Sequence, residues 1–243
     1  MSRRRIAYAT AIAALMAGAI LAAPTAAARF NPKPPAPKTL AVERAAYIAP
    51  VTYLAAVKIT RPNGLGSGFH IGSGLVVTAA HVVSGAKTVS IKDAQGKTGM
   101  AEIVAIDEAN DVAVMRTRHK MLATEIDCGT VDVGSDILAV GMPLGQEFIT
   151  SYGRIAGAPR DLHGRKVYVT DMTTIMGQSG SGVWSGGRVI GVTSAAMVAP
   201  FELVGRDVKE GNGIYAQSVV GFGYVVPSSV ACALVAGLEG EGA

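Results

Sequence analysis

The chain has little charge, few aromatic residues and few of the side chains that bind metals. Only 16% of its 243 residues are Asp, Glu, Lys or Arg, 5% are aromatic, and it contains two cysteines and four histidines. Neither cysteine has the close spacing to another Cys or His that metal sites use. With 49% hydrophobic residues, this composition excludes a disordered chain and favours a globular one without a bound metal.

The first 28 residues have the pattern of a secretory signal peptide. Three arginines at positions 3–5 precede an apolar run at 6–23, and small residues at 26–28 match a signal-peptidase site. The alternative is an uncleaved membrane anchor, although the run is short and Ala-rich for a bilayer span. We expect an exported protein, periplasmic or extracellular, that contacts a membrane only if this segment is retained.

Removal of the signal peptide also changes the charge. It takes away three arginines and no acid, so the formal charge falls from +4 to +1. A nearly neutral chain offers no electrostatic basis for binding nucleic acid, and we expect no such partner.

After the signal, residues 29–44 form a proline-rich linker. Four prolines within ten residues favour extended backbone over a packed core. The folded domain then occupies residues 45–243. Helical periodicity is concentrated at its end, where residues 228–238 predict a short helix that Ser228 or Ser229 caps.

The rest of this domain is a succession of short strands. Two sets of about six are separated by a polar stretch near 117–130. The pattern predicts an all-β fold of two packed six-stranded antiparallel β-barrels, one at about 45–117 and the other at about 130–227. The long segment 195–220 is expected to be a loop, either functional or merely at the surface. The expected strands are 51–59, 66–71, 75–78, 88–91, 100–106 and 112–116, then 136–140, 148–156, 167–170, 182–184, 188–192 and 221–226.

The two cysteines are far apart in the sequence. Cys128 lies in a loop before a strand, and Cys232 lies in the C-terminal helix. Export would permit a disulfide between them. Buried free thiols are the more ordinary interpretation of these contexts, and the disulfide stays open as the alternative.

A serine among glycines, Ser179, is a candidate nucleophile. A serine hydroxyl needs a base within hydrogen-bond reach, an acid that orients the base, and donors for an oxyanion. His81 directly follows an apolar strand, which is a rigid place for a base. Asp111 precedes an apolar run and is expected to be buried, as the orienting acid should be. Ser181 is an alternative nucleophile.

The segments that carry these residues resemble, in chain order, the His, Asp and Ser motifs of chymotrypsin-like (trypsin-like) serine proteases. They read Thr78-Ala79-Ala80-His81, Asn110-Asp111-Val112-Ala113-Val114 and Gly177-Gln178-Ser179-Gly180. The order His, Asp, Ser differs from that of subtilisins and α/β-hydrolases. The resemblance implies a chymotrypsin-like double barrel.

Further segments narrow the resemblance to HtrA/Deg-type bacterial proteases. Residues 66–69, 140–145 and 221–228 are similar to that group, whereas the Ser-Gly-Ser sequence at 179–181 resembles bacterial glutamyl endopeptidases. HtrA proteases usually carry a PDZ domain after the protease domain. Here only the short helix and a few residues follow Pro227, so no PDZ domain is expected.

The resemblance implies a role for each residue. Ser179 attacks the scissile carbonyl, His81 transfers the proton, and Asp111 holds His81 in the correct tautomer. The backbone N–H groups of Gly177 and Ser179 form the oxyanion hole. This chemistry needs no metal or other cofactor. The resemblance therefore predicts an exported serine endopeptidase, a hydrolase acting on polypeptides. The alternatives are an inactive protease-like binding module and a membrane-anchored envelope protein.

The substrate pocket is expected to be neutral. Its candidate lining residues are Thr173, Thr174, Thr193 and Ser194. Trypsin-like proteases carry an Asp near the position of Thr173, and glutamyl endopeptidases carry a His where Thr193 stands. The resemblance therefore predicts a neutral or small apolar residue before the scissile bond.

Overall fold

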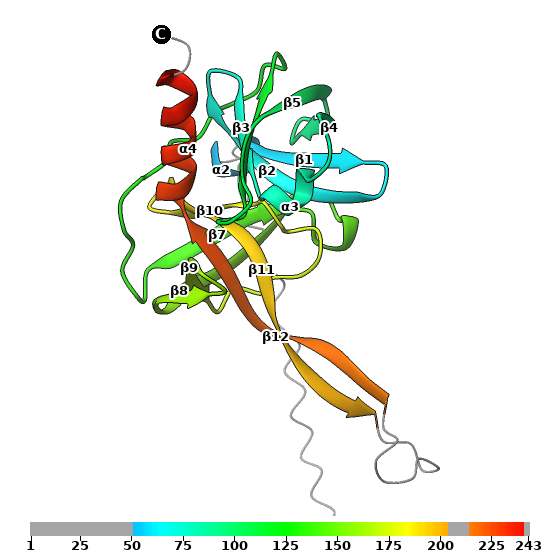
Figure 1. Cartoon of the computed structure of the whole chain (residues 1–243), viewed down its shortest axis with the longest axis vertical. Coiled ribbons are helices and arrows are strands. Elements are labelled where there is room, and N and C mark those ends of the chain that lie inside the picture. The colour runs from blue at the N-terminus through cyan, green and yellow to red at the C-terminus, as the bar shows by residue number, and fades with distance from the viewer. Residues whose placement is uncertain (1–50, 204–213, 241–243) are drawn as a thin grey trace, which may run out of the picture. The chain divides into compact units, whose positions relative to one another are not determined.

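The computed structural model describes residues 51–203 and 214–240 (Figure 1). The expected signal peptide, residues 1–28, and the expected linker, residues 29–44, lie outside this range. In the described residues, twelve strands form two closed barrels of six, and every strand pair is antiparallel. The predicted all-β double barrel is therefore confirmed.

The first barrel has the strand order β1-β2-β3-β6-β5-β4. Residues 51–54, expected to begin the first strand, instead form a short helix, and this detail of the prediction was wrong. The turn places the ring of Tyr53 6.0 Å from that of Phe148 in the second barrel. The elements are α2 Val51–Leu54, β1 Ala56–Arg61, β2 Gly64–Gly72, β3 Leu75–Thr78, α3 Ala80–Val83, β4 Thr88–Asp93, β5 Thr98–Asp107 and β6 Val112–Thr117.

Strand β3 explains how the first barrel meets the second. Its four residues are all buried, because both faces of the strand are covered. Val76 packs into the core of the first barrel. Leu75 and Val77 belong to a second cluster that also contains Trp184 of the second barrel. A strand covered on both sides reads as a continuous apolar run, and it holds its C-terminal end rigidly at the junction of the barrels.

The second barrel has the strand order β10-β11-β12-β9-β8-β7. Its last two strands are longer than predicted and continue as a paired ribbon, from Ala195 opposite Tyr224 to Leu203 opposite Ile214. Figure 1 shows this ribbon projecting from the barrel. The elements are β7 Asp136–Gly141, η1 Pro143–Gly145, β8 Ile149–Leu162, β9 Arg165–Thr170, β10 Gly182–Ser185, β11 Arg188–Leu203 and β12 Ile214–Pro227.

The expectation of a loop over residues 195–220 was therefore wrong for its flanks. Its charged residues lie between positions 202 and 210 of the sequence, and most of these positions are outside the described residues. The flanking residues include β-branched ones, and Val198 pairs directly with Val219. Cross-strand pairs of this kind stabilise antiparallel strands.

The C-terminal helix α4, Ser228–Gly240, returns the chain to the first barrel. Leu234 and Leu238 pack against the cluster that contains Val112 and Val114 of β6. The hydroxyl of Ser228, expected as a cap, donates to the carbonyl oxygen of Asp127 between the barrels. Of the helices in the described range, none is long and apolar enough to cross a membrane.

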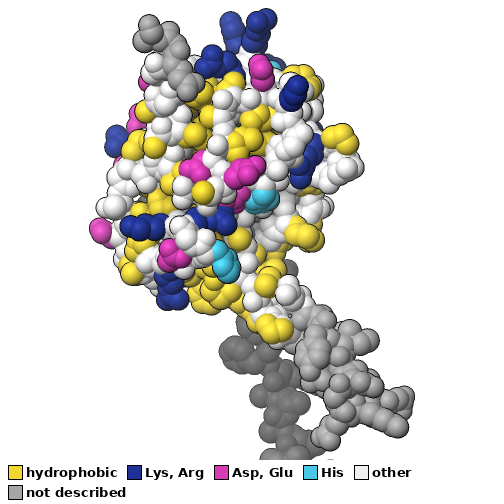
Figure 2. Space-filling model, in the orientation of Figure 1, with side chains coloured by type: hydrophobic (Ala, Val, Ile, Leu, Met, Phe, Trp, Pro, Cys, Tyr) yellow, Lys and Arg dark blue, Asp and Glu magenta, His cyan; other side chains and the backbone are white. Residues whose placement is uncertain are grey.

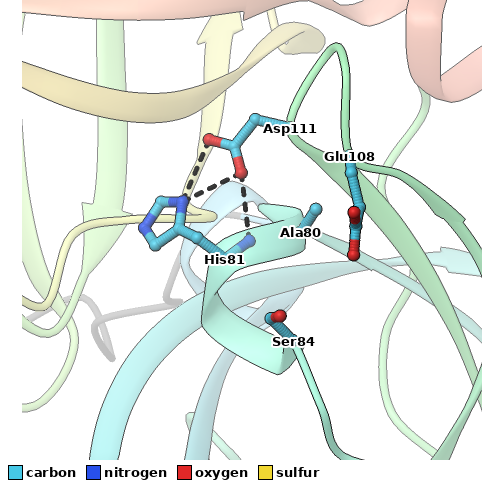
Figure 3. A pocket seen from close by; sticks show the side chains of 5 residues that line it. All are labelled: Ala80, His81, Ser84, Glu108 and Asp111. Carbon is cyan, nitrogen blue, oxygen red and sulfur yellow. Dashed lines mark hydrogen bonds and ion pairs between the residues drawn. The ribbon is translucent and has the colours of Figure 1, made fainter.

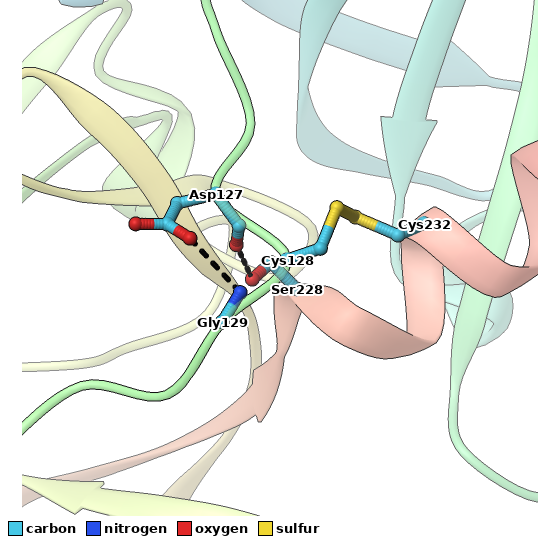
Figure 4. Close-up of a disulfide and its surroundings, with 5 residues drawn as sticks. All are labelled: Asp127, Cys128, Gly129, Ser228 and Cys232. Atoms are coloured by element: carbon cyan, nitrogen blue, oxygen red, sulfur yellow. Dashed lines mark hydrogen bonds between the residues drawn. A yellow bond between two sulfur atoms is a disulfide. The ribbon is translucent and has the colours of Figure 1, made fainter.

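Cys128 and Cys232 form a disulfide (Figure 4), so the prediction of free thiols was wrong. Their Cα atoms lie 6.0 Å apart although 104 residues separate them in the sequence. The bond joins α4 to the segment that connects the two barrels. The return of α4 to the first barrel brings the cysteines together, and their local contexts do not reveal it.

We expect removal of this disulfide to destabilise the domain. A cross-link that closes a loop of this length restricts the unfolded chain, and its loss typically costs about 2–5 kcal/mol. Urea denaturation of the Cys128→Ser, Cys232→Ser double variant should show that loss in the free energy of unfolding. Wild-type protein in excess dithiothreitol should match the variant. Equal stability of oxidised wild type and double variant would contradict the prediction.

Candidate active site

His81 lies in the single turn of α3, directly after the rigid end of β3. Val82 and Val83 are buried and anchor the turn. The imidazole is half exposed. The backbone N–H of His81 donates to Oδ1 of Asp111 at 3.0 Å. The same apolar run that builds β3 therefore delivers a histidine ring to the surface at the junction of the barrels.

Asp111 faces this ring from the turn between β5 and β6. Nδ1 of His81 lies 2.9 Å from Oδ1 and 3.0 Å from Oδ2 of the carboxylate (Figure 3). The backbone of Asp111 has φ 59°, a left-handed conformation that Asp tolerates better than most residues. Because the carboxylate accepts from Nδ1–H, Nε2 of His81 is left as the proton acceptor.

Two further groups approach the same carboxylate. The hydroxyl of Ser194 donates to Oδ2, and Nη1 of Arg165 lies 3.1 Å from it. Nη1 of Arg165 also donates to the Ser194 oxygen at 3.0 Å. Burial by itself would raise the pKa of Asp111, but hydrogen bonds from His81 and Ser194 hold it below its ordinary value. The carboxylate is therefore ionised at neutral pH.

A pocket of about 240 Å³ opens beside this pair. It is lined by His81, Asp111, Ala80, Ser84 and Glu108, and Figure 3 shows these side chains around it. Acidic side chains and histidine gather at the centre of the face in Figure 2. The pocket leaves the imidazole accessible from solvent.

Ser179 lies in a loop that is located between the two barrels and contacts both of them. Its carbonyl oxygen accepts from the N–H of Ser67 at 2.8 Å. A Cβ on Gly180 would lie 2.2 Å from both the carbonyl oxygen of Ser67 and Oγ1 of Thr78, so only glycine permits this approach. The loop thus lies against the strand end that carries His81. No hydrogen bond joins the Ser179 hydroxyl to the His81 ring in the described part of the chain, as is common without substrate.

The loop leaves two backbone donors free. Gly177 has φ 95°, and its carbonyl oxygen accepts from the Ser67 hydroxyl at 2.8 Å. Among residues 51–203 and 214–240, the N–H groups of Gly177 and Ser179 have no hydrogen-bond acceptor. Two free donors beside a serine hydroxyl can receive a developing oxyanion.

Two residues that the sequence analysis did not assign support this arrangement. The side chain of Gln178 is buried; Oε1 accepts from the Ile175 N–H at 2.8 Å, and Nε2 donates to Ser151 at 2.8 Å. Its position in the sequence, between Gly177 and Ser179, could have identified it as a residue that supports the serine loop. Arg165 begins β9, and no local signal in the sequence connects it with Asp111.

The four expected pocket residues are not equivalent. The side chain of Thr173 is exposed, whereas Thr174 and Thr193 are buried. Thr193 holds the serine loop through its backbone: its carbonyl oxygen accepts from Gly180 N–H at 2.7 Å, and its N–H donates at 2.9 Å to the carbonyl oxygen of Ser181. The hydroxyl of Ser194 is engaged with Asp111. The structure therefore brings Ser194 into the His–Asp arrangement.

Two antiparallel six-stranded barrels with a His–Asp pair and a serine loop at their junction define a chymotrypsin-like peptidase domain. The family model described as "Trypsin-like peptidase domain" matches residues 66–192. The chain belongs to this family and is a trypsin-like, serine-type peptidase domain.

Curated relatives are HtrA/Deg-type proteases. The "Serine protease Do-like HtrA" of Lactobacillus helveticus is 30% identical over 182 residues, which cover 70% of this chain and 41% of the relative. The "Periplasmic pH-dependent serine endoprotease DegQ" of Escherichia coli is 29% identical over 179 residues, which cover 70% and 36%. The chain thus spans less than half the length of these relatives.

Solved structures agree on the fold. The "HtrA-type protease AlgW with tripeptide" is 22% identical with a TM-score of 0.64, and the match covers 78% of this chain and 62% of that one. The inactive form of the Rv3671c protease of M. tuberculosis is 25% identical with a TM-score of 0.59, covering 76% and 89%.

Proposed function

We propose that this chain is a serine endopeptidase in which Ser179, His81 and Asp111 hydrolyse peptide bonds through an acyl-enzyme. One observation carries the proposal. Nδ1 of His81 is held by both oxygens of an ionised Asp111, beside a serine loop in which two N–H groups have no acceptor among the described residues. The names of the relatives, which are serine proteases, support the same reaction class.

The reaction proceeds in two halves. The Ser179 oxygen attacks the scissile carbonyl while Nε2 of His81 takes its proton, and the oxyanion binds the N–H groups of Gly177 and Ser179. The C–N bond then breaks, and His81 gives the proton to the leaving amine. Water repeats the sequence on the ester and releases the carboxylic acid. Asp111 stays anionic and stabilises the imidazolium in both halves.

Labelling with a fluorophosphonate probe tests the proposal against an inactive binding module. The probe should modify the wild-type chain, because an activated serine attacks its phosphorus and displaces fluoride. The Ser181→Ala variant should be labelled equally well. Failure to label folded wild-type protein would falsify the proposed activity.

Replacement of Gly177 by alanine should lower kcat. The new Cβ would lie 2.1 Å from the carbonyl oxygen of Met142 at φ 95°, so the backbone must move and the oxyanion loses a donor. Loss of one donor costs about 10²- to 10³-fold. The rate of hydrolysis of a chromogenic ester measures this change in kcat.

Gly187→Ala is the matched control for this prediction. Gly187 has φ 84°, and an added Cβ would meet nothing within 4 Å. This variant should lower the melting temperature through the left-handed backbone alone, without the clash at Gly177, while kcat is kept. An equal loss of kcat in both variants would argue against a special role for Gly177.

The boundaries and location of the protein belong to the same proposal. Residues 1–28 direct export and are removed. Residues 29–44 form a linker before the folded part of the chain, and residues 45–243 form the protease domain. The periplasmic relatives support export. N-terminal sequencing of the exported chain should begin at Arg29; a retained N-terminus would instead favour the membrane-anchored envelope protein.

The proposed substrates are polypeptides with a neutral or small apolar residue before the scissile bond.

A further inference from the structure

Arg165 brings a positive charge to the Asp111 carboxylate from the second barrel. It is the first residue of β9, directly after the two-residue turn of His163 and Gly164. Both turn residues have positive φ, 55° and 84°, as in the type I′ turn of a tight hairpin. This turn fixes the point at which the arginine side chain leaves the strand. Nη1 of Arg165 lies 3.1 Å from Oδ2 of Asp111 and donates to the Ser194 oxygen at 3.0 Å.

The Asp111 carboxylate has enough hydrogen-bond donors without Arg165. Oδ1 accepts from the backbone N–H and from Nδ1 of His81, at 3.0 and 2.9 Å. Oδ2 lies 3.0 Å from the same Nδ1 and accepts from the Ser194 hydroxyl. These three groups already fix the carboxylate. The guanidinium therefore adds a positive charge to the site and does not fill a missing hydrogen bond.

The guanidinium occupies this position at a cost in free energy. Only 21% of the Arg165 side chain is exposed, and its Nε is buried without an acceptor among the described residues. Burial of a charged group with an unpaired N–H is unfavourable, and a partly buried ion pair does not by itself stabilise a fold more than neutral side chains do. A position that served only packing would be filled better by a neutral residue. The charge of Arg165 therefore indicates an electrostatic role.

Other charged side chains near His81 do not contact the carboxylate that faces the imidazole. Glu108 lines the pocket beside His81 (Figure 3), but its side chain is exposed, so solvent weakens its effect. Arg61 of β1 donates to the backbone carbonyl oxygen of His81 at 3.4 Å. Asp107 accepts from N–H groups of its own turn at 2.8 and 2.9 Å. Arg165 differs from these three residues because it contacts that carboxylate directly.

We infer that Arg165 extends the activity of the peptidase to more acidic pH, as a positioning residue that acts through Asp111. The Asp111 carboxylate attracts a proton onto the imidazole of His81, and the guanidinium offsets part of this attraction. A protonated imidazole cannot take the proton of Ser179. Without the charge of Arg165, activity should therefore be lost at a higher pH. The inference rests on the proposed function and extends it to the pH range in which the enzyme works.

The pH dependence of fluorophosphonate labelling tests this inference on the full chain without a known substrate. The Ser179 oxygen forms a bond to phosphorus, the P–F bond breaks and fluoride leaves, and His81 takes the serine proton. The second-order rate constant of labelling therefore falls on the acid side, where His81 is protonated. Arg165→Gln should move the midpoint of this acid limb up by about 0.5–1 pH unit, which below both midpoints is a loss of about 3- to 10-fold relative to the plateau. The plateau itself should be kept, because three groups still fix the carboxylate.

Further variants separate the charge of Arg165 from its shape. Arg165→Met is neutral and apolar and should shift the acid limb as Arg165→Gln does, whereas Arg165→Lys keeps the charge and should stay close to wild type. Arg188→Gln is the matched control. Arg188 is likewise the first residue of a strand, β11, and pairs with the exposed Glu125 at 2.9 Å, so this variant removes the same net charge. It should retain the wild-type acid limb, and melting temperatures check that each variant folds.

The outcomes separate this inference from the proposed function. An unchanged acid limb in a folded neutral variant that the probe labels would overturn the role of Arg165 and leave the peptidase intact. An equal shift in Arg188→Gln would assign the effect to net charge and would also overturn that role. If neither neutral variant folds, Arg165 is a structural residue and the inference fails. A folded wild-type chain that the probe does not label overturns the peptidase, and the inference with it.

Discussion

Replacing Ser179 with alanine should lower kcat for peptide hydrolysis by about 10⁶-fold, the scale seen when a serine protease loses its nucleophile. The alanine methyl group cannot form the acyl-enzyme. The loop should keep its shape, because its anchors are backbone hydrogen bonds from Ser67 to Ser179 and from Gly180 to Thr193. Stopped assays with a peptide or ester substrate, together with probe labelling, measure the loss.

Ser181→Ala is the control for this result. The Ser181 side chain is fully buried, and its oxygen lies 2.3 Å from where a Cβ on Gly141 would be. It is therefore packed away from solvent. The variant should retain activity, and its stability should change only slightly. Activity that survives Ser179→Ala and disappears in Ser181→Ala would reassign the nucleophile.

Asp111→Asn should lower kcat by about 10⁴-fold, as loss of the orienting carboxylate does in serine proteases of this mechanism. An amide N–H facing Nδ1 would move the imidazole proton to Nε2, so His81 could no longer take the serine proton. Burst and steady-state kinetics at neutral pH would measure the change. The matched control is Asp93→Asn, since Asp93 is a buried acid whose Oδ2 lies 2.8 Å from Nε2 of His119. That variant should lose stability but keep kcat.

The Asp111→Asn substitution should also change how the stability of the domain depends on pH. The native pKa of Asp111 lies below its ordinary value, so the native state favours the charged form. This contribution is fully present above the pKa of the unfolded carboxyl, about 3.9, and is lost as pH falls through the native value. The difference in free energy of unfolding between wild type and Asp111→Asn should therefore narrow below about pH 4. A constant difference from pH 6 to pH 3 would contradict the prediction.

The sequence by itself was sufficient to predict the approximate positions of the strands and their grouping into two sets of six. Alternation and apolar runs are local properties, so each of the twelve strands overlaps its expected position, although β11 and β12 extend well beyond theirs. The first began with a helix instead, because Tyr53 packs on the distant Phe148. The order of the His, Asp and Ser segments was also readable, since each is a short contiguous motif.

Only the tertiary structure decided the contacts between distant segments. The disulfide joins residues 104 positions apart, and Arg165 and Ser194 reach the Asp111 carboxylate from β9 and β11. The apolar groove lined by Leu65, Leu144 and Met176 likewise combines residues from β2, η1 and the serine loop. Each depends on how the two closed barrels meet, which local periodicity does not encode. The sequence determined which residues we propose for the chemistry, and the packing of the barrels decided which other residues surround them.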